Sequence, residues 1–212
     1  MVVTVQAILF DADGVIQHAT RDLPARLGLA LGFVPDPLEL FIREVFAAEL
    51  PSLNGEVDVV EALEPVVARW GAAGRAAKLV EHWWCSIEVD QALLSLIRTL
   101  RLRGFTCALA TNQHRHRAQY MARALGYAEL FDRSFYSCDL GFAKPDVRYF
   151  QAVLNQLRLA PGDVLFIDDN PGNIDAASAV GIRAAHFVHP RSDHAVDAMS
   201  SLLERFAVRL SG

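Results

Sequence analysis

The sequence predicts an α/β fold, in which a Rossmann-like, doubly wound parallel sheet forms the core and an α-helical cap domain is inserted into it. Three observations support this fold class. Short, continuously apolar runs suit strands that are covered on both faces of a sheet. Helical patterns with short connections alternate with the later runs, which is typical of parallel sheets. A span of about 75 residues after the first run leaves room for an insertion.

Five apolar runs are the predicted strands, and they cover residues 5–10, 105–111, 133–137, 163–168 and 183–188. The predicted helices of the core cover residues 91–102, 114–125, 146–157 and 173–180. Gly104 and Gly181 follow the first and the last of these helices, where glycine commonly ends a helix.

The connection that follows the first strand is much longer than a simple crossover, which needs about a dozen residues and a helix. It contains no convincing strand pattern, carries five prolines, and has apolar residues at helical spacing. We therefore expect a core domain of residues 1–15 and 91–212 and a helical cap domain of residues 16–90. The alternative is that these helices only pad the core.

The composition excludes several classes of protein. The 212 residues carry a net charge of −5 without a basic stripe, which argues against nucleic acid as a partner. No apolar stretch reaches the ~18 residues that span a bilayer, and the N-terminal apolar run is broken by Asp11, so we expect neither a membrane anchor nor a signal peptide. The three scattered cysteines fit a reduced, cytoplasmic setting, and we expect a monomer or homodimer.

Polar side chains follow four of the predicted strands. They are Asp11 and Asp13 after the first, Thr111 and Asn112 after the second, Lys144 in the loop after the third, and Asp168 and Asp169 after the fourth. Each of these residues alone has an ordinary explanation, as a turn, a helix start or a solvated loop. Because ligands of open parallel sheets bind at the carboxyl ends of the strands, their joint placement predicts one shared site.

Charge repulsion indicates what this site holds. Two carboxylates ~4 Å apart repel by about 4 kcal/mol at an effective dielectric constant of ~20, so four converging carboxylates need compensation. An all-oxygen ligand set without paired His or Cys favours Mg²⁺, which also accepts phosphate oxygens from a substrate. With Lys144 and the Thr111 hydroxyl added, the site predicts phosphoryl transfer on a small phosphorylated substrate.

Four motifs, in order along the chain, resemble those of the haloacid dehalogenase superfamily of hydrolases with a helical cap. They are "LFDADGV", "LATN", "GFAKPD" and "FIDDNPGNIDAA". The resemblance implies that Asp11 is a nucleophile that forms an aspartyl-phosphate and that Asp13 is the general acid/base. It implies that Thr111 and Asn112 bind phosphate and that Lys144 positions nucleophile and phosphate. It also implies that Asp169, with Asp168 beside it, Asp11 and the backbone carbonyl of Asp13 hold Mg²⁺.

Asp13 discriminates between members of this superfamily, because dehalogenating members lack the second aspartate and need no metal. Its presence therefore favours a phosphate substrate, and the double aspartate of the fourth motif resembles that of sugar-phosphate phosphatases, so we expect a small, sugar-phosphate-like metabolite. Dehalogenation, phosphonate hydrolysis with Lys78 as the cap lysine, and mutase activity are the alternatives within the superfamily. A non-catalytic phosphoacceptor or binding module is the alternative from another class.

Cap and hinge residues are candidates for choosing the substrate. His18 is a candidate ligand of a substrate hydroxyl, and the alternative is an exposed hinge histidine. We expect Trp83 and Trp84 to pack at the junction of cap and core rather than to form a sugar platform. His114 and His116 are expected to lie at a solvated helix start.

Overall fold

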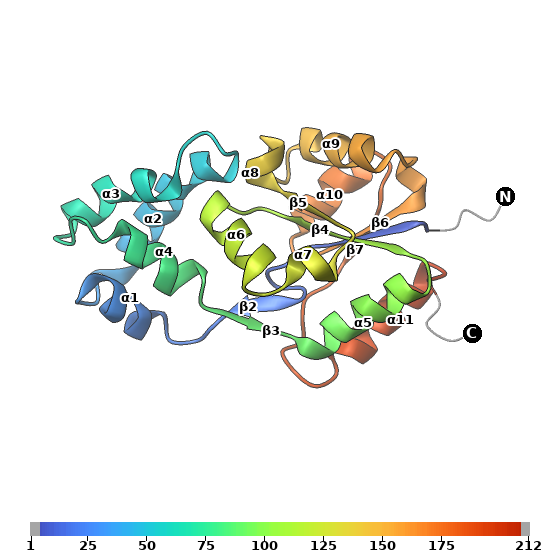
Figure 1. Cartoon of the computed structure of the whole chain (residues 1–212), viewed down its shortest axis with the longest axis horizontal. Coiled ribbons are helices and arrows are strands. Elements are labelled where there is room, and N and C mark those ends of the chain that lie inside the picture. The colour runs from blue at the N-terminus through green and yellow to red at the C-terminus, as the bar shows by residue number, and fades with distance from the viewer. Residues whose placement is uncertain (1–4, 209–212) are drawn as a thin grey trace.

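The computed structural model describes residues 5–208, and its core is a five-stranded parallel sheet, as predicted (Figure 1). In spatial order the strands are β5 (Arg133–Tyr136), β4 (Thr106–Thr111), β1 (Ala7–Phe10), β6 (Val164–Asp168) and β7 (Arg183–His186). In the register of the central strands, Leu9 lies between Ala108 and Phe166. Because every pair in this sheet is parallel, the carboxyl ends of the strands meet at one edge.

Helices cover both faces of the sheet, which explains why the strands are apolar throughout instead of alternating. Ile8 and Phe10 of β1 belong to the apolar cluster of one face, and Ala7 and Leu9 to that of the other. The first face is covered by α5 (Gln91–Leu102), α6 (Arg115–Arg123), α7 (Tyr127–Leu130) and α11 (Ala195–Arg205). The second is covered by α9 (Val147–Leu157) and α10 (Pro171–Ala179), with the short elements α8 (Ser137–Leu140) and η1 (Pro161–Asp163) in the connections.

Local sequence explains where the core helices begin and end. The Asp90 carboxylate accepts hydrogen bonds from the first amides of α5, and Gly104 follows that helix with a φ of 89°. Helix α10 begins after Asn170, whose side chain accepts a hydrogen bond from the amide of Gly172, and has Pro171 in its first turn.

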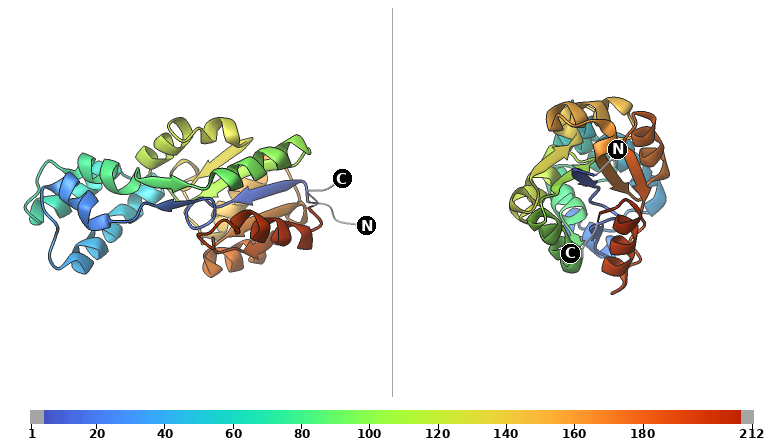
Figure 2. Two further views of the ribbon diagram at one scale, coloured as in Figure 1. Left: turned by 90° about the horizontal axis from the view of Figure 1, so that it is seen from below. Right: turned by 90° about the vertical axis from the view of Figure 1, so that its right-hand side faces the viewer.

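The inserted cap consists of four helices with an apolar cluster of their own. They are α1 (Leu23–Leu31), α2 (Leu38–Leu53), α3 (Val59–Arg69) and α4 (Ala76–Trp84). Leu27, Phe41, Leu63 and Leu79, one from each helix, are fully buried in this cluster. Figure 2 shows that these helices extend from one end of the sheet, the end at which the strands finish. The cap is therefore a separately packed layer beside the predicted site rather than padding of the core.

The expectation that residues 16–90 contain no strand is wrong. Strands β2 (Gln17–Ala19) and β3 (Ile87–Val89) lie near the two ends of this span and pair in antiparallel fashion, Gln17 opposite Val89. Each strand has three residues, too few for a periodic pattern to be recognised in the sequence. The ribbon of β2 and β3 therefore lies at both points where the chain passes between the core and the cap.

None of the helices within residues 5–208 combines the length and the hydropathy needed to cross a membrane.

Candidate active site

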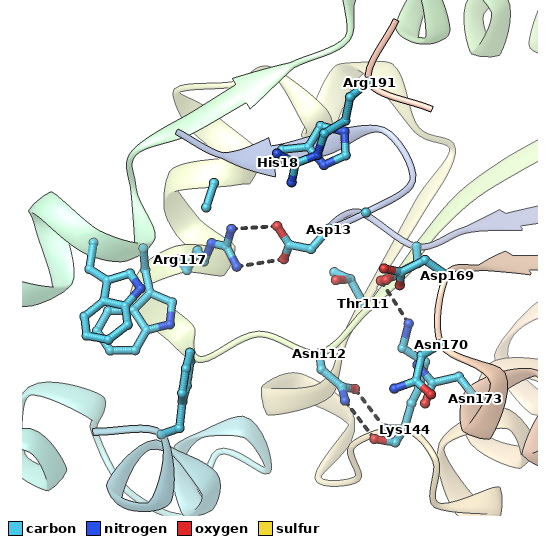
Figure 3. Close-up of a pocket in the computed structure, with 16 residues that line it drawn as sticks. Asp13, His18, Thr111, Asn112, Arg117, Lys144, Asp169, Asn170, Asn173 and Arg191 are labelled. Carbon is cyan, nitrogen blue, oxygen red and sulfur yellow. Dashed lines mark hydrogen bonds and ion pairs between the residues drawn. The ribbon is translucent and has the colours of Figure 1, made fainter. Parts of the chain in front are cut away.

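A cavity of about 500 Å³ lies between the carboxyl edge of the sheet and the cap. The core contributes the predicted residues Asp11, Asp13, Thr111, Lys144 and Asp169 to its wall, and Asn112 lies there as well (Figure 3). The cap contributes the aromatic side chains of Phe46, Trp83 and Trp84. The residues that sequence reasoning placed at four strand ends therefore meet in one place.

Lys144 is the central cation of this site. Its ammonium group lies 2.9 Å from a carboxylate oxygen of Asp11 and 2.6 Å from one of Asp168, and it donates a third hydrogen bond to the carbonyl of Ala110. The ammonium is almost completely buried, and the two carboxylates raise its pKa although burial alone would lower it. Lys144 therefore stays charged, and it compensates the repulsion that the sequence predicted between the aspartates.

Asn112 fixes the loop that carries Lys144. Its side-chain amide donates to the backbone carbonyl of Lys144 and its side-chain carbonyl accepts from the backbone amide of Lys144, both at 2.8 Å. This pair of bonds acts between the end of β4 and a residue more than thirty positions later. The position of Asn112 is thus explained by support of the lysine loop, while contact with phosphate stays a prediction.

Asp11 is the first residue after β1, and its side chain is nine-tenths buried. Burial raises the pKa of the Asp11 carboxyl to about 7, and Lys144 offsets only part of this rise. A buried carboxylate beside a lysine ammonium at the wall of a cavity is suited to act as a nucleophile.

Asp168 is a completely buried carboxylate that accepts four hydrogen bonds. It accepts from Lys144, from the side-chain amide of Asn173 on α10 and from the backbone amide of Asn170. Both of its oxygens are therefore in use, and Asp168 anchors Lys144 and the start of α10.

A divalent cation fits the acidic group at this edge. Oxygen atoms of Asp11, Asp168 and Asp169 lie within 4.8 Å of one another. Among residues 5–208, the Asp169 carboxylate has no side-chain partner and is bonded only to its own backbone amide, and burial and Asp168 raise its pKa. The backbone at Gly14 approaches it so closely that a Cβ there would lie 2.0 Å from its Oδ2. An unpaired carboxylate in an all-oxygen group matches the preference of Mg²⁺.

The Asp13 carboxylate lies outside this group. Arg117 of α6 holds it from one side with two hydrogen bonds, and Gln113 and Gln17 donate to it as well. Burial would raise the pKa of Asp13, but Arg117 and the amide donors hold it below the usual value. Any part of Asp13 in metal binding would fall to its backbone carbonyl, as the resemblance implies, and this stays a prediction.

Thr111 ends β4 with its side chain at the cavity, and its hydroxyl accepts a hydrogen bond from Gln113 at 3.1 Å. His18 also lines the cavity, with its ring edge-on to that of His189 at 4.5 Å between centroids. Burial and the neighbouring cations lower the pKa of His18, and its Nε2 is buried without a partner among the described residues.

Trp83 and Trp84 were expected to pack at the junction of cap and core, and the structure shows them both packed in the cap and lying on the cavity wall. Both indoles are buried in the apolar cluster of the cap, where they stack on each other at 4.9 Å, and both also reach the cavity wall. Phe46, which sequence reasoning did not single out, packs against Trp83 and is 47% exposed, so it presents an apolar surface toward the site.

The expectation of a solvated helix start at His114 is wrong, whereas His116 is exposed. His114 is completely buried, and its Nδ1 accepts the amide of Arg117 as the cap of α6. Burial, with Arg117 and His116, lowers its pKa to about 3. Its Nε2 lies 3.9 Å from a carboxylate oxygen of Glu49, a buried residue of the cap helix α2. His116 instead pairs with Asp58 at 2.8 Å.

Sequence reasoning missed Arg117, Gln113 and Arg191. Arg191 lies on the cavity wall in the loop after β7, and its side chain has no hydrogen bond or ion pair within residues 5–208. The available signal was the spacing of Gln113 and Arg117, four residues apart directly after Thr111, which places both on one side of the helix start.

Comparisons with known proteins agree with this site. The family model of haloacid dehalogenase-like hydrolases matches residues 5–181. A phosphoglycolate phosphatase of Cereibacter sphaeroides is 28% identical over 205 residues, which cover 85% of this chain and 84% of that protein. A sesquiterpene phosphatase of Aspergillus oryzae is 31% identical over 97 residues, which cover 46% of this chain and 50% of that protein.

A crystal structure of a HAD-family enzyme from Bacteroides thetaiotaomicron, in complex with magnesium and inorganic phosphate, has a TM-score of 0.74 at 18% identity. The match covers 91% of this chain and 98% of that one, and at this identity it shows the fold. The chain spans half the length, or less, of several curated relatives that it matches. The motifs, the fold and a family match over most of the residues agree, and the chain belongs to the haloacid dehalogenase-like hydrolase family.

Proposed function

We propose that the protein is a Mg²⁺-dependent phosphatase, which hydrolyses a small phosphorylated metabolite through a phospho-aspartyl intermediate on Asp11. The observation that carries this proposal is the position of the Asp11 carboxylate, at the cavity wall, 2.9 Å from Lys144 and within the acidic group that suits a divalent cation. The phosphatases among the relatives and the magnesium and phosphate complex of a structural neighbour support it.

The chemistry assigns one task to each side chain. A carboxylate oxygen of Asp11 attacks phosphorus, and the bond to the ester oxygen breaks. Asp13 gives a proton to that oxygen and then takes one from the water that hydrolyses the aspartyl-phosphate. Lys144 and Thr111 stabilise charge on the phosphoryl oxygens. Bound Mg²⁺, held by Asp11, Asp169 and Asp168, would supply positive charge opposite the same oxygens.

The cavity restricts the substrate to a small molecule. We propose a sugar-phosphate-like metabolite whose phosphate lies among Thr111, Asn112 and Lys144, with the remainder between His18 and the aromatic surface of Phe46. The position of the His18 side chain on the cavity wall supports a contact with a substrate hydroxyl. The phosphoglycolate phosphatase relative supports testing phosphorylated acids alongside sugars.

Four alternatives find less support. A dehalogenase would have no use for the carboxyl of Asp13 or for a cation. Phosphonate cleavage needs a lysine from the cap at the site, whereas Lys78 is exposed on α4 and is absent from the cavity wall in the described part of the chain. A mutase needs a second phosphate site in the cap, and within the described residues the cap places no arginine or lysine on the cavity wall. A phosphoacceptor module has no need of an enclosing cap.

The same proposal includes the remaining expectations. Residues 16–90 act as the cap and the rest as the core, with the β2–β3 ribbon at the boundary. The protein acts in the cytoplasm as a monomer or homodimer without nucleic acid, which the net charge of −5 and three free cysteines support.

Hydrolysis of 4-nitrophenyl phosphate with added Mg²⁺ tests the proposal. We expect Asp11→Asn to lower turnover by at least 1,000-fold, a loss typical of a covalent nucleophile, and EDTA to stop the wild-type reaction until Mg²⁺ is restored. Asp175→Asn, at an exposed carboxylate of α10, is the matched control and should keep the wild-type rate. Wild-type rates in Asp11→Asn, or turnover in EDTA, would contradict the mechanism. A panel of sugar phosphates, nucleotides and phosphorylated acids then identifies the substrate.

A further inference from the structure

The Asp13 carboxylate is held by four hydrogen bonds. Oδ1 accepts from Arg117 Nη2 at 2.8 Å and from Gln17 Nε2 at 3.1 Å. Oδ2 accepts from Arg117 Nη1 at 2.7 Å and from Gln113 Nε2 at 2.9 Å. Each oxygen therefore has two donors, which is the number of lone pairs that a carboxylate oxygen offers. The two contacts from Arg117 appear as parallel dashed lines in Figure 3.

The donors are themselves fixed by buried partners. Arg117 is 8% exposed, and its Nη1 also donates to the side-chain carbonyl of Gln113. Gln113 is 2% exposed and donates to Thr111 as well, while Gln17 is completely buried and accepts the hydroxyl of Tyr127. The network thus joins a hinge strand, the end of β4 and two helices around one carboxyl group.

Geometry decides what this network can do. A guanidinium that donates two parallel bonds fixes the plane of a carboxylate as well as its distance, which an ammonium does not. The Asp13 side chain is nevertheless 39% exposed, on the side of the cavity. The paired contact with Arg117 therefore sets the plane of the Asp13 carboxylate toward a bound ester, and the two glutamines complete its hydrogen bonds.

A direct role of Arg117 in holding substrate fits the contacts less well. Both hydrogens of Nη1 are used, one by Asp13 and one by Gln113, and Nη2 is bonded to Asp13. Its Nε is buried without a partner in the described structure and has no access to the cavity. Only the second hydrogen of Nη2 is left for a substrate, so a direct contact would be a single hydrogen bond rather than the paired contact that Asp13 receives.

We propose that Arg117, supported by Gln113 and Gln17, is the positioning residue that aims the carboxyl of Asp13 at the leaving-group oxygen. This inference rests on the proposed phosphatase function. In the first step an Asp11 oxygen bonds to phosphorus, the ester P–O bond breaks with its electron pair on oxygen, and that oxygen takes the proton of Asp13. In the second step water bonds to phosphorus and gives its proton to Asp13, and the bond from phosphorus to Asp11 breaks.

The network also allows Asp13 to carry this proton. Arginine can only donate, whereas a glutamine amide that turns presents its carbonyl oxygen and accepts. Gln17, whose contact is the longest of the four at 3.1 Å, lies in the hinge ribbon and is the residue best placed to turn. Arg117 can keep its two hydrogen bonds to Asp13 while the side-chain amide of Gln17 changes from a donor to an acceptor.

The test compares two esters that share a ring but differ in their need for a proton. Nitrophenolate leaves without protonation, whereas the benzyl alkoxide of benzyl phosphate requires it. We expect Arg117→Met to lower kcat/KM for benzyl phosphate by about 100-fold, the low end for general acid catalysis, and that for 4-nitrophenyl phosphate by less than about fivefold. Arg123→Met, at an exposed arginine of the same helix, should leave both values unchanged.

Arg117→Lys keeps the buried charge but loses the planar fork, so it serves if the methionine variant does not fold. We expect it to lower the benzyl to nitrophenyl ratio by about tenfold. Equal losses on both esters in an active, folded variant would overturn the positioning role and leave the proposed function standing. A wild-type protein that hydrolyses neither ester with Mg²⁺ would overturn both.

Discussion

Glu49 of the cap helix α2 is a buried carboxyl at the contact between cap and core. It is 7% exposed, and its nearest charged or titratable neighbours are His114, 3.9 Å away, and Arg117 and Asp13 of the site. Burial raises the pKa of Glu49 to about 7, although Arg117 and a hydrogen bond from the Trp84 indole lower it in part. We predict that Glu49→Gln stabilises the protein at alkaline pH and leaves its stability near pH 4.5 almost unchanged.

The sign follows from the proton that Glu49 holds. Between the ordinary pKa of 4.5 and about 7, the folded protein binds this proton while the unfolded chain releases it. The stability that Glu49 contributes is therefore complete below pH 4.5 and is lost as the pH rises through 7. At 1.36 kcal/mol for each pH unit, the loss reaches about 3 kcal/mol at pH 8. Glutamine has the same shape and does not titrate, so the variant avoids this loss.

Urea denaturation at pH 5, 6.5 and 8 measures the difference directly. We expect the free energy of unfolding of Glu49→Gln to exceed that of the wild type by about 1 to 3 kcal/mol at pH 8 and by much less at pH 5. Glu81→Gln, at an exposed glutamate of α4, is the control and should show no pH-dependent difference. A difference that is the same at all three pH values would refute the reasoning, because it would show that Glu49 titrates normally in the folded protein.

Two further predictions concern the site. Gly14→Ala should weaken Mg²⁺ binding at least tenfold, because the new Cβ displaces the Asp169 carboxylate. Gly104→Ala is the control, because Gly104 has a similar φ of 89° but open space where the Cβ would lie. A similar loss of Mg²⁺ binding in Gly104→Ala would point to backbone strain instead. The Mg²⁺ dependence of turnover and of the melting temperature measures both. Arg191→Ala should raise KM about tenfold for phosphorylated acids but not for phosphate esters without a second acidic group, because the Arg191 guanidinium has no partner among residues 5–208 and lies at the cavity wall. Equal changes in KM for both classes of substrate would contradict this role. The same change in the control variant Arg205→Ala would contradict it as well.

Most of the core could be predicted because its signals are local. In a sheet that helices cover on both faces, each strand is a short apolar run bounded by polar residues, which can be recognised in the sequence. The helix at residues 91–102 was predicted with the same bounds as α5. Strands β2 and β3 could not be found in this way, because three residues show no period and their pairing joins positions about seventy residues apart. The cap was predicted as an insertion, but its contact with the core through Glu49 and His114 was not.

The same distinction holds within the site. Asp11, Thr111, Lys144 and Asp169 were found because the carboxyl ends of parallel strands meet at one edge, a consequence of topology that the order of motifs already contains. Whether a polar residue near a helix start faces solvent or the interior depends on the helix's rotation in the fold. His114 was therefore expected in water and is buried, and Arg117, which is buried as well, was not singled out.

The sequence by itself determined the order of strands and helices, the edge at which the carboxylates gather, and the need for a compensating cation. Only the tertiary structure decided how those carboxylates divide their tasks. Asp11 and Asp13 are one residue apart, yet Lys144 holds the first beside the acidic group while Arg117 turns the second away from it. The physical reason is that local sequence fixes backbone direction and periodicity, whereas a side chain's partner depends on which distant residue the packed fold brings within hydrogen-bonding distance.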